Sequence, residues 1–187
     1  ARKLLGADAA TKKDCCALVA TTLNRETGKT EVVFVRVWTP ELNEPLKLTE
    51  TIQKEIIRLH EQYHVAGVYF DPFQMAAISE TCRKAGVKMI EFPQTSRRVE
   101  SDTRLRELSI GNNLSHYGDT ELREHITSAV VKDSGERGLR IFKELSRTKI
   151  DAAVALSMSA QGTAELLAQS RASGMETAAN PFYGEGN

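Results

Sequence analysis

At 187 residues, with a formal net charge of zero and 41% hydrophobic residues, the chain has the size and composition of one globular domain. No run approaches the roughly 20 apolar residues that span a bilayer, and the start lacks the charged-then-apolar order of a secretory leader. A membrane protein is therefore disfavoured, and a cytoplasmic location is expected. The three cysteines, Cys15, Cys16 and Cys82, are too few and too poorly spaced for a tetrahedral zinc site, and we interpret them as reduced thiols.

The zero net charge conceals an uneven distribution along the chain. Residues 83–149 carry 14 basic and 10 acidic side chains, against 10 and 11 in residues 1–82 and 1 and 4 in residues 150–187. A protein that binds nucleic acid needs such a basic footprint, but surface arginines and lysines are also common without one. Charge alone leaves both interpretations open.

The first part of the chain predicts three antiparallel strands. Residues 3–8 and 17–23 are two short apolar runs, and residues 31–38 form the run richest in β-branched and aromatic residues. Residues 24–29 contain the Asn and Gly typical of a turn. The result is a meander whose first strand ends on a carboxylate, Asp8.

Two helices and two further strands are predicted next. Residues 49–64 have an amphipathic helical period, and residues 65–70 form a fourth strand closed by Asp71, because a residue before proline is pushed to extended geometry. Residues 73–85 are predicted as a helix and residues 87–92 as a fifth strand. A second carboxylate thus ends a second strand.

The order of these elements predicts the sheet. A strand–helix–strand crossover is normally parallel and right-handed, so the fourth strand can return beside the first and parallel to it. The expected architecture is α/β, with a five-stranded mixed sheet in the order 3-2-1-4-5 flanked by helices. Strand ends that carry Asp8 and Asp71 would face one crevice at the switch point of the sheet.

The rest of the chain is predicted to be more helical. Helices are expected at 102–110 and 120–131, with a short extended piece at 113–117 between them. The polar, glycine-containing stretch 132–138 is followed by residues 139–143, which mix apolar and basic side chains. Together the two segments predict a hairpin.

A last helix is expected from 149 to 170, with small residues that allow close packing on the sheet. We expect one domain over 1–171 and a loose tail over 172–187, which is rich in glycine and poor in core residues.

Three carboxylates could carry chemistry: Asp8, Asp71 and Asp151. The first two end neighbouring strands, and the third lies in the first turn of the last helix. Taken singly, Asp71 could serve a turn and Asp151 the helix dipole. Together, three carboxylates at one point would repel one another unless divalent cations such as Mg²⁺ or Mn²⁺ compensate them. Two metal ions so held can hydrolyse a phosphodiester.

Three segments resemble motifs of the nuclease part of phage terminase large subunits. They are residues 4–8 (LLGAD), 68–74 (VYFDPFQ) and 149–156 (KIDAAVAL), in matching order and spacing. The stretch 113–116 and the helix from 120 resemble what precedes the last motif, so the likeness covers most of residues 3–160.

This resemblance implies a ribonuclease H-like fold and a two-metal endonuclease that cuts double-stranded DNA with little sequence preference. It also implies cutting of concatemeric viral DNA by a packaging motor in the host cytoplasm. An ATPase domain, a portal and a small terminase subunit are the partners that the resemblance implies. Asp8, Asp71 and Asp151 match the acidic positions. Asp14 is similar to an additional acidic position of some members, with an ordinary surface turn as the favoured interpretation.

Several basic residues are candidates for contacting DNA. Lys149 lies beside the third motif, where it could approach a scissile phosphate or pair with a carboxylate. The predicted hairpin could act as a DNA-contacting flap. The candidate residues are Lys149, Arg147, Arg137, Arg140 and Lys143. His116 and His125 are interpreted as ordinary helix-flanking or surface histidines.

The chain has no phosphate-binding loop, because Leu23 stands where the first glycine should precede Gly28 and Lys29, and a strand follows. We therefore expect the C-terminal nuclease part of such a protein. Three alternatives remain: a transposase or junction resolvase of the same fold, a receiver-like phosphoacceptor module, and a docking module with vestigial carboxylates.

Overall fold

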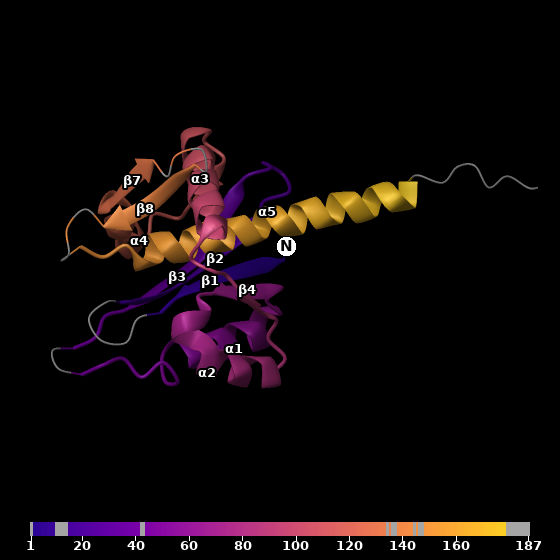
Figure 1. Ribbon diagram of the computed structural model, residues 1–187. Coiled ribbons are helices and arrows are strands. Elements are labelled where there is room, and N and C mark those ends of the chain that lie inside the picture. The colour runs from indigo at the N-terminus through magenta and orange to yellow at the C-terminus, as the bar shows by residue number, and fades with distance from the viewer. Residues whose placement is uncertain are drawn as a thin grey trace, which may run out of the picture.

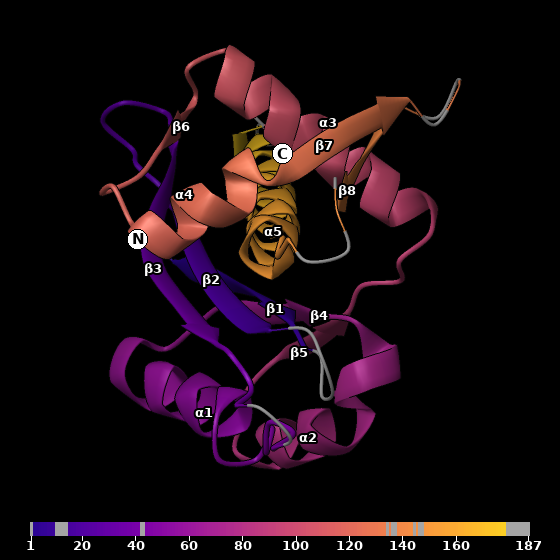
Figure 2. The same ribbon diagram turned by 90° about the vertical axis from the view of Figure 1, so that its left-hand side faces the viewer.

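The computed structural model describes residues 2–9, 15–41, 44–133, 135, 138–143, 145 and 148–178. A mixed sheet lies between two layers, with α1 and α2 on one face and α5, α3, α4 and a small hairpin on the other (Figures 1 and 2). No helix in these ranges is long and apolar enough to cross a membrane.

The centre of the sheet is the predicted meander. Strands β1 (Lys3–Asp8), β2 (Cys16–Leu23) and β3 (Thr30–Trp38) pair antiparallel in that order. Nearly every residue of β1 and β2 is buried, which is why both strands are continuously apolar. This meander also contradicts the receiver-like alternative, which requires strands and helices to alternate from the start.

The remaining strands extend the sheet on both sides. Strand β4 (Gly67–Phe70) runs parallel to β1, and β5 (Met89–Glu91) runs parallel to β4. The order β5-β4-β1-β2-β3-β6 confirms the predicted 3-2-1-4-5. It adds one edge strand, β6 (Leu114–Ser115), within the segment expected to be extended.

Two helices cover one face of the sheet. Helix α1 (Ile52–Tyr63) and helix α2 (Pro72–Lys84) pack over the odd-numbered residues of β1, including Leu5 and Ala7. Helix α1 lies within the predicted range 49–64, and its N-cap is Thr51. Asp71 caps α2 and its proline occupies the first turn, where a missing N–H costs nothing.

The helices predicted after the fifth strand need correction. Helix α3 (Ser96–Ile110) begins six residues before the expected start, and α4 (Thr120–Thr127) ends well before residue 131. The residues after α4 instead form β7 (Ala129–Asp133), because its valines pair with β8 (Leu139–Lys143) and β-branched side chains favour that geometry. The predicted hairpin is thus confirmed, with a longer first strand.

Helix α5 (Asp151–Ala178) crosses the other face of the sheet along β1 and β2 (Figures 1 and 2). All thirteen residues from 151 to 163 are buried, so the helix carries small and apolar residues on every side. It continues to Ala178, past the boundary expected at 171–172, while residues 179–187 lie outside the described part of the chain.

Close approach of α5 to the sheet depends on glycine. A Cβ atom at Gly6 would overlap the carbonyl oxygen of Ala155, and one at Gly162 would overlap the ring of Tyr69. Gly6 and Tyr69 are register partners in β1 and β4, so both contacts lie at the same level of the sheet. The helix backbone therefore lies directly on β1, and the ring of Tyr69 from β4 fits beneath the helix.

We expect Gly6→Ala to lower the free energy of unfolding by about 3 kcal/mol or more, because the methyl group meets backbone that cannot move aside. Gly67→Ala is a matched control on the neighbouring strand. There the new Cβ would meet side-chain ends, Ile90 Cδ1 at 2.9 Å and Leu4 Cδ2 at 3.3 Å, which can adjust. Denaturant unfolding of both variants measures the difference; equal losses would contradict the close-contact explanation.

Candidate functional site

Three carboxylates gather around one end of the sheet. Asp8 is the last residue of β1, Asp71 follows β4 directly, and Asp151 is the first residue of α5. Asp151 is only 5% exposed, while Asp8 and Asp71 are half-buried. Segments separated by some 60 to 80 residues in sequence thus converge as the sequence predicts.

Strand register explains why Asp8 and Asp71 face the same side. Ala7 pairs with Phe70 between parallel strands, so the next residues on the two strands are neighbours. Side chains alternate along a strand, and Gly6 and Tyr69 contact α5. Asp8 and Asp71, two residues further on, therefore belong to the face on which α5 begins with Asp151.

The electrostatics of Asp8 record this crowding. Burial, followed by repulsion from Asp151 and Asp71, raises the pKa of Asp8 from 3.8 to about 7. Arg98 and Lys143 act in the opposite direction. At neutral pH the site therefore holds a carboxylate that is reluctant to ionise, which is the condition that a bound cation relieves.

The carboxylates are neighbours without forming a closed ligand cluster. Across the described ranges, no group of three or more His, Cys, Asp or Glu side chains is arranged to hold a metal ion. One reason lies at Asp71, whose Oδ1 accepts a hydrogen bond from Phe73 N at 3.0 Å and so caps α2. The donor chemistry fits a hard divalent cation, since all three groups supply oxygen.

His125 is buried beside the site, which corrects its interpretation as a helix-flanking or surface residue. It is 7% exposed, and its Nδ1 accepts a hydrogen bond from Ala152 N at 2.9 Å. Burial lowers the pKa of this imidazole, so the neutral form, which can accept at Nδ1, is favoured. His125 thereby satisfies a backbone donor in the first turn of α5, directly after Asp151.

A second buried group joins the hairpin to the site. Asp102 of α3 accepts hydrogen bonds from Arg98 Nε, at 2.8 and 2.9 Å, and from Ser157 Oγ at 2.6 Å. It also accepts one from Ile141 N of β8 at 2.9 Å. One carboxylate thus ties α3, α5 and the hairpin together, and its partner Arg98 lies close enough to lower the pKa of Asp8.

These residues carry no signal in the sequence. A lone His in an amphipathic helix and an Arg–Asp pair four residues apart are ordinary features of solvated helices. Only the tertiary contacts show that His125, Arg98 and Asp102 are buried around the carboxylates.

The basic candidates are placed unevenly. Lys143, at the end of β8, lies close enough to influence both Asp8 and His125, and Lys149 lines a small cavity with His125. Arg140 lies near the start of β8, with its guanidinium 5.5 Å from the centroid of the Phe142 ring. Arg137, Arg147 and the acidic candidate Asp14 lie outside the described residues.

Phage large terminases are among the solved structures with a similar fold. The bacteriophage HK97 large terminase aligns with a TM-score of 0.74 and 17% identity, over 86% of this chain and 39% of its own. The large terminase nuclease from thermophilic phage G20c aligns with a TM-score of 0.63 and 16% identity, over 84% of this chain and 80% of its own. These likenesses show the fold, which is ribonuclease H-like as expected, with one more strand than predicted.

The sequence comparison identifies the family of the chain, which the fold alone does not. Residues 9–165 match the model of the endonuclease domain of the terminase large subunit, a span that includes Asp71 and Asp151 and begins directly after Asp8. The chain therefore belongs to the family of terminase large-subunit endonuclease domains. No curated protein matches it. The chain spans well under half of the HK97 large terminase, 39% of its length.

Because the pKa of Asp8 is raised, the pH dependence of the free energy of unfolding tests the carboxylate site. Between about pH 4 and pH 7 the folded chain binds more protons at Asp8 than the unfolded chain does, so the free energy of unfolding falls as the pH rises. We expect metal-free Asp8→Asn to exceed the wild type by about 1–2 kcal/mol at pH 8, with the difference vanishing near pH 4.

Thermal and denaturant unfolding across this pH range, with EDTA present, measure the effect. Millimolar MgCl₂ should narrow the difference at pH 8 by stabilising the wild type. A wild type that is the more stable protein at pH 8 without metal would contradict the repulsion at Asp8.

Proposed function

We propose that this chain is a divalent-metal-dependent endonuclease domain that hydrolyses phosphodiester bonds of double-stranded DNA with little sequence specificity. The convergence of Asp8, Asp71 and Asp151 at one end of a terminase-type nuclease fold is the observation that carries the proposal. In this role the chain would cut concatemeric viral DNA during genome packaging.

Mg²⁺ or Mn²⁺, bound as two ions, is the proposed cofactor. Three carboxylates supply the oxygen donors that such cations prefer. Burial first, and repulsion from Asp151 and Asp71 second, raise the pKa of Asp8, and a bound cation would counter both effects. Structures of the G20c nuclease contain magnesium, cobalt or zinc, which supports a divalent ion at the matching site. Bound there, a metal pair would supply an activated water and stabilise the leaving oxygen.

The protein's own residues would position these groups. Asp8, Asp71 and Asp151 would hold the ions between the ends of β1, β4 and α5. His125 would keep the start of α5, and with it Asp151, in place through its bond to Ala152 N. Lys143 and Lys149 would attract a DNA phosphate toward the carboxylates, since both lie on the adjoining segments.

The surroundings of the domain follow from the family and remain proposals. An ATPase domain, a portal and a small terminase subunit are the expected partners of a packaging motor in the host cytoplasm. The match of this chain to 39% of the HK97 large terminase is consistent with a nuclease part of a larger protein.

Cleavage of supercoiled plasmid tests the catalytic proposal. We expect nicking and linearisation with Mg²⁺ or Mn²⁺, none with EDTA, and a loss of roughly 100-fold or more in Asp71→Asn and Asp151→Asn, because each removes a metal ligand. Glu61→Gln, which neutralises an exposed carboxylate on α1, is the matched control and should cut like the wild type. Equal inactivity of all four folded proteins with either metal would favour the docking alternative, and cutting confined to four-way junctions would favour a resolvase.

The hairpin gives a separate prediction about DNA binding. Arg140→Ala with Lys143→Ala should reduce the slope of log affinity against log salt by about 1 to 2. Each phosphate contact that is lost lowers the number of counterions released on binding. Lys84→Ala with Lys88→Ala removes the same charge from the α2 side and should leave the slope unchanged. Fluorescence anisotropy with a labelled duplex in Ca²⁺ or EDTA measures both; matching slopes in the two double variants would exclude the hairpin from the DNA interface.

A further inference from the structure

The hairpin of β7 and β8 is a small sheet of its own. Among the described strands, these two pair only with each other, and the six-stranded sheet does not continue into them. A two-stranded hairpin is marginally stable in water by itself, so its position depends on what its outer edges contact. The main contacts of the hairpin are those of β8 with α3 and, to a lesser extent, of β7 with α4.

Two consecutive side chains of α3 bind the outer backbone edge of β8. Asp102 Oδ2 accepts a hydrogen bond from Ile141 N at 2.9 Å. Thr103 Oγ1 accepts one from Leu139 N, also at 2.9 Å, and donates its own proton to the carbonyl of Val99 at 2.8 Å. Alternate N–H groups of a strand point to the same edge, so these side chains occupy the place of a neighbouring strand.

Asp102 connects this edge with the carboxylate site. Its carboxyl group, in a residue that is 1% exposed, also accepts hydrogen bonds from Arg98 Nε and from Ser157 Oγ. Arg98 lies close enough to Asp8 to act on its charge, and Ser157 belongs to α5, the helix that begins with Asp151. A displacement of β8 from α3 would therefore break a bond to the same carboxylate that holds α5.

The anchored strand carries two of the basic residues that are candidates for contacting DNA. Arg140 lies between the two anchored residues of β8, and Lys143 ends the strand, close enough to Asp8 to act on its charge. A basic side chain on a hairpin that is already fixed loses less conformational freedom when it meets a phosphate than one on a hairpin that is free to move.

We propose that Asp102 and Thr103 are positioning residues for the DNA substrate. By fixing β8 on α3, they hold Arg140 and Lys143 at a constant position relative to the carboxylates, so that these side chains meet the DNA without reordering the hairpin. The proposal rests on the proposed nuclease function, since the hairpin has this role only if DNA is the substrate.

Amide hydrogen exchange of the whole chain tests the anchoring without DNA. Thr103→Val keeps the shape of the side chain and removes the acceptor of Leu139 N, so this amide should exchange about 10-fold faster or more. Ser101→Ala is the matched control on α3, because its hydroxyl group contacts Ser157 of α5, and it should leave the exchange of Leu139 unchanged. Equal exchange in Thr103→Val and the wild type would overturn the anchoring.

A double-mutant cycle tests the role in DNA binding. Fluorescence anisotropy with a labelled duplex in Ca²⁺ measures the affinity of the wild type, Thr103→Val, Arg140→Ala and the double variant. We expect Arg140→Ala to weaken binding about 3- to 10-fold in the wild type and less than about 2-fold in Thr103→Val. A residue that only stabilises the fold would give additive losses. Asp102→Asn, where circular dichroism shows it folded, should repeat the result.

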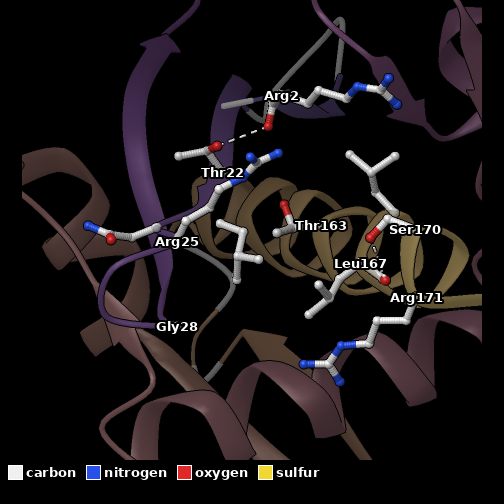
Figure 3. A pocket seen from close by; sticks show the side chains of 11 residues that line it. Arg2, Thr22, Arg25, Gly28, Thr163, Leu167, Ser170 and Arg171 are labelled. Atoms are coloured by element: carbon white, nitrogen blue, oxygen red, sulfur yellow. Dashed lines mark hydrogen bonds between the residues drawn. The ribbon is translucent and has the colours of Figure 1, made fainter. Parts of the chain in front are cut away.

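Arg25→Ala provides the control charge for this cycle. Arg25 is exposed in the turn between β2 and β3, at the opposite end of β1 from the carboxylates, where it lines a hollow beside the later part of α5 (Figure 3). Its effect on duplex affinity should be the same in the wild type and in Thr103→Val, because the hairpin does not position it.

The outcomes separate this proposal from the nuclease function. Equal losses from Arg140→Ala in the two backgrounds, or no loss in either, would overturn the positioning role. If the wild type still cuts plasmid with Mg²⁺ or Mn²⁺ in that case, the nuclease function stands without it. A wild type that neither binds duplex nor cuts plasmid would overturn both.

Discussion

The close contact of α5 with strands β1 and β4 is the constraint on which the rest of the structure depends. Because Gly6 has no side chain, the helix backbone can lie on β1, and because Gly162 has none, the ring of Tyr69 can lie under the helix. This contact sets the height of α5 above the sheet and hence the position of Asp151 relative to Asp8. Helices α3 and α4 then pack against α5, and the hairpin packs against α3 through β8.

The second determinant is the environment of Asp8, where burial first and repulsion from Asp151 and Asp71 second raise the pKa of the carboxyl group. Asp8 is crowded by Asp151 and Asp71, yet the surrounding residues are held by hydrogen bonds that do not depend on the charge of Asp8. His125 caps α5, and Asp102 binds Arg98, Ser157 and the backbone of β8. The crowded carboxylates are therefore surrounded by hydrogen bonds that other buried residues form.

Local sequence signals were sufficient for the order of strands β1 to β5 and for placing Asp8 and Asp71 at strand ends and Asp151 at the start of α5. The apolar runs of β1 and β2, the proline after Asp71 and the small residues after Asp151 each determine local structure strongly, and the crossover rule fixes the strand order. Errors occurred where tertiary contacts decide. Val130 and Val131 follow a helical period, but pairing with β8 draws them into a strand.

The parts of the site that the sequence did not reveal share one physical cause. His125 and Asp102 occupy helices that appear amphipathic and polar, and their burial results from packing against α5 and β8, residues distant in sequence. Pattern and spacing along the chain contain no information about such encounters.

Burial on every side also determines how α5 behaves in time. Amide hydrogens exchange with solvent through local openings, and an element that is enclosed from residue 151 to residue 163 cannot open without separating both its neighbours and the sheet. Asp151 therefore remains in place for as long as the domain is folded. The hairpin, whose β7 is largely exposed, can open in a smaller fluctuation that does not require α5 to unfold.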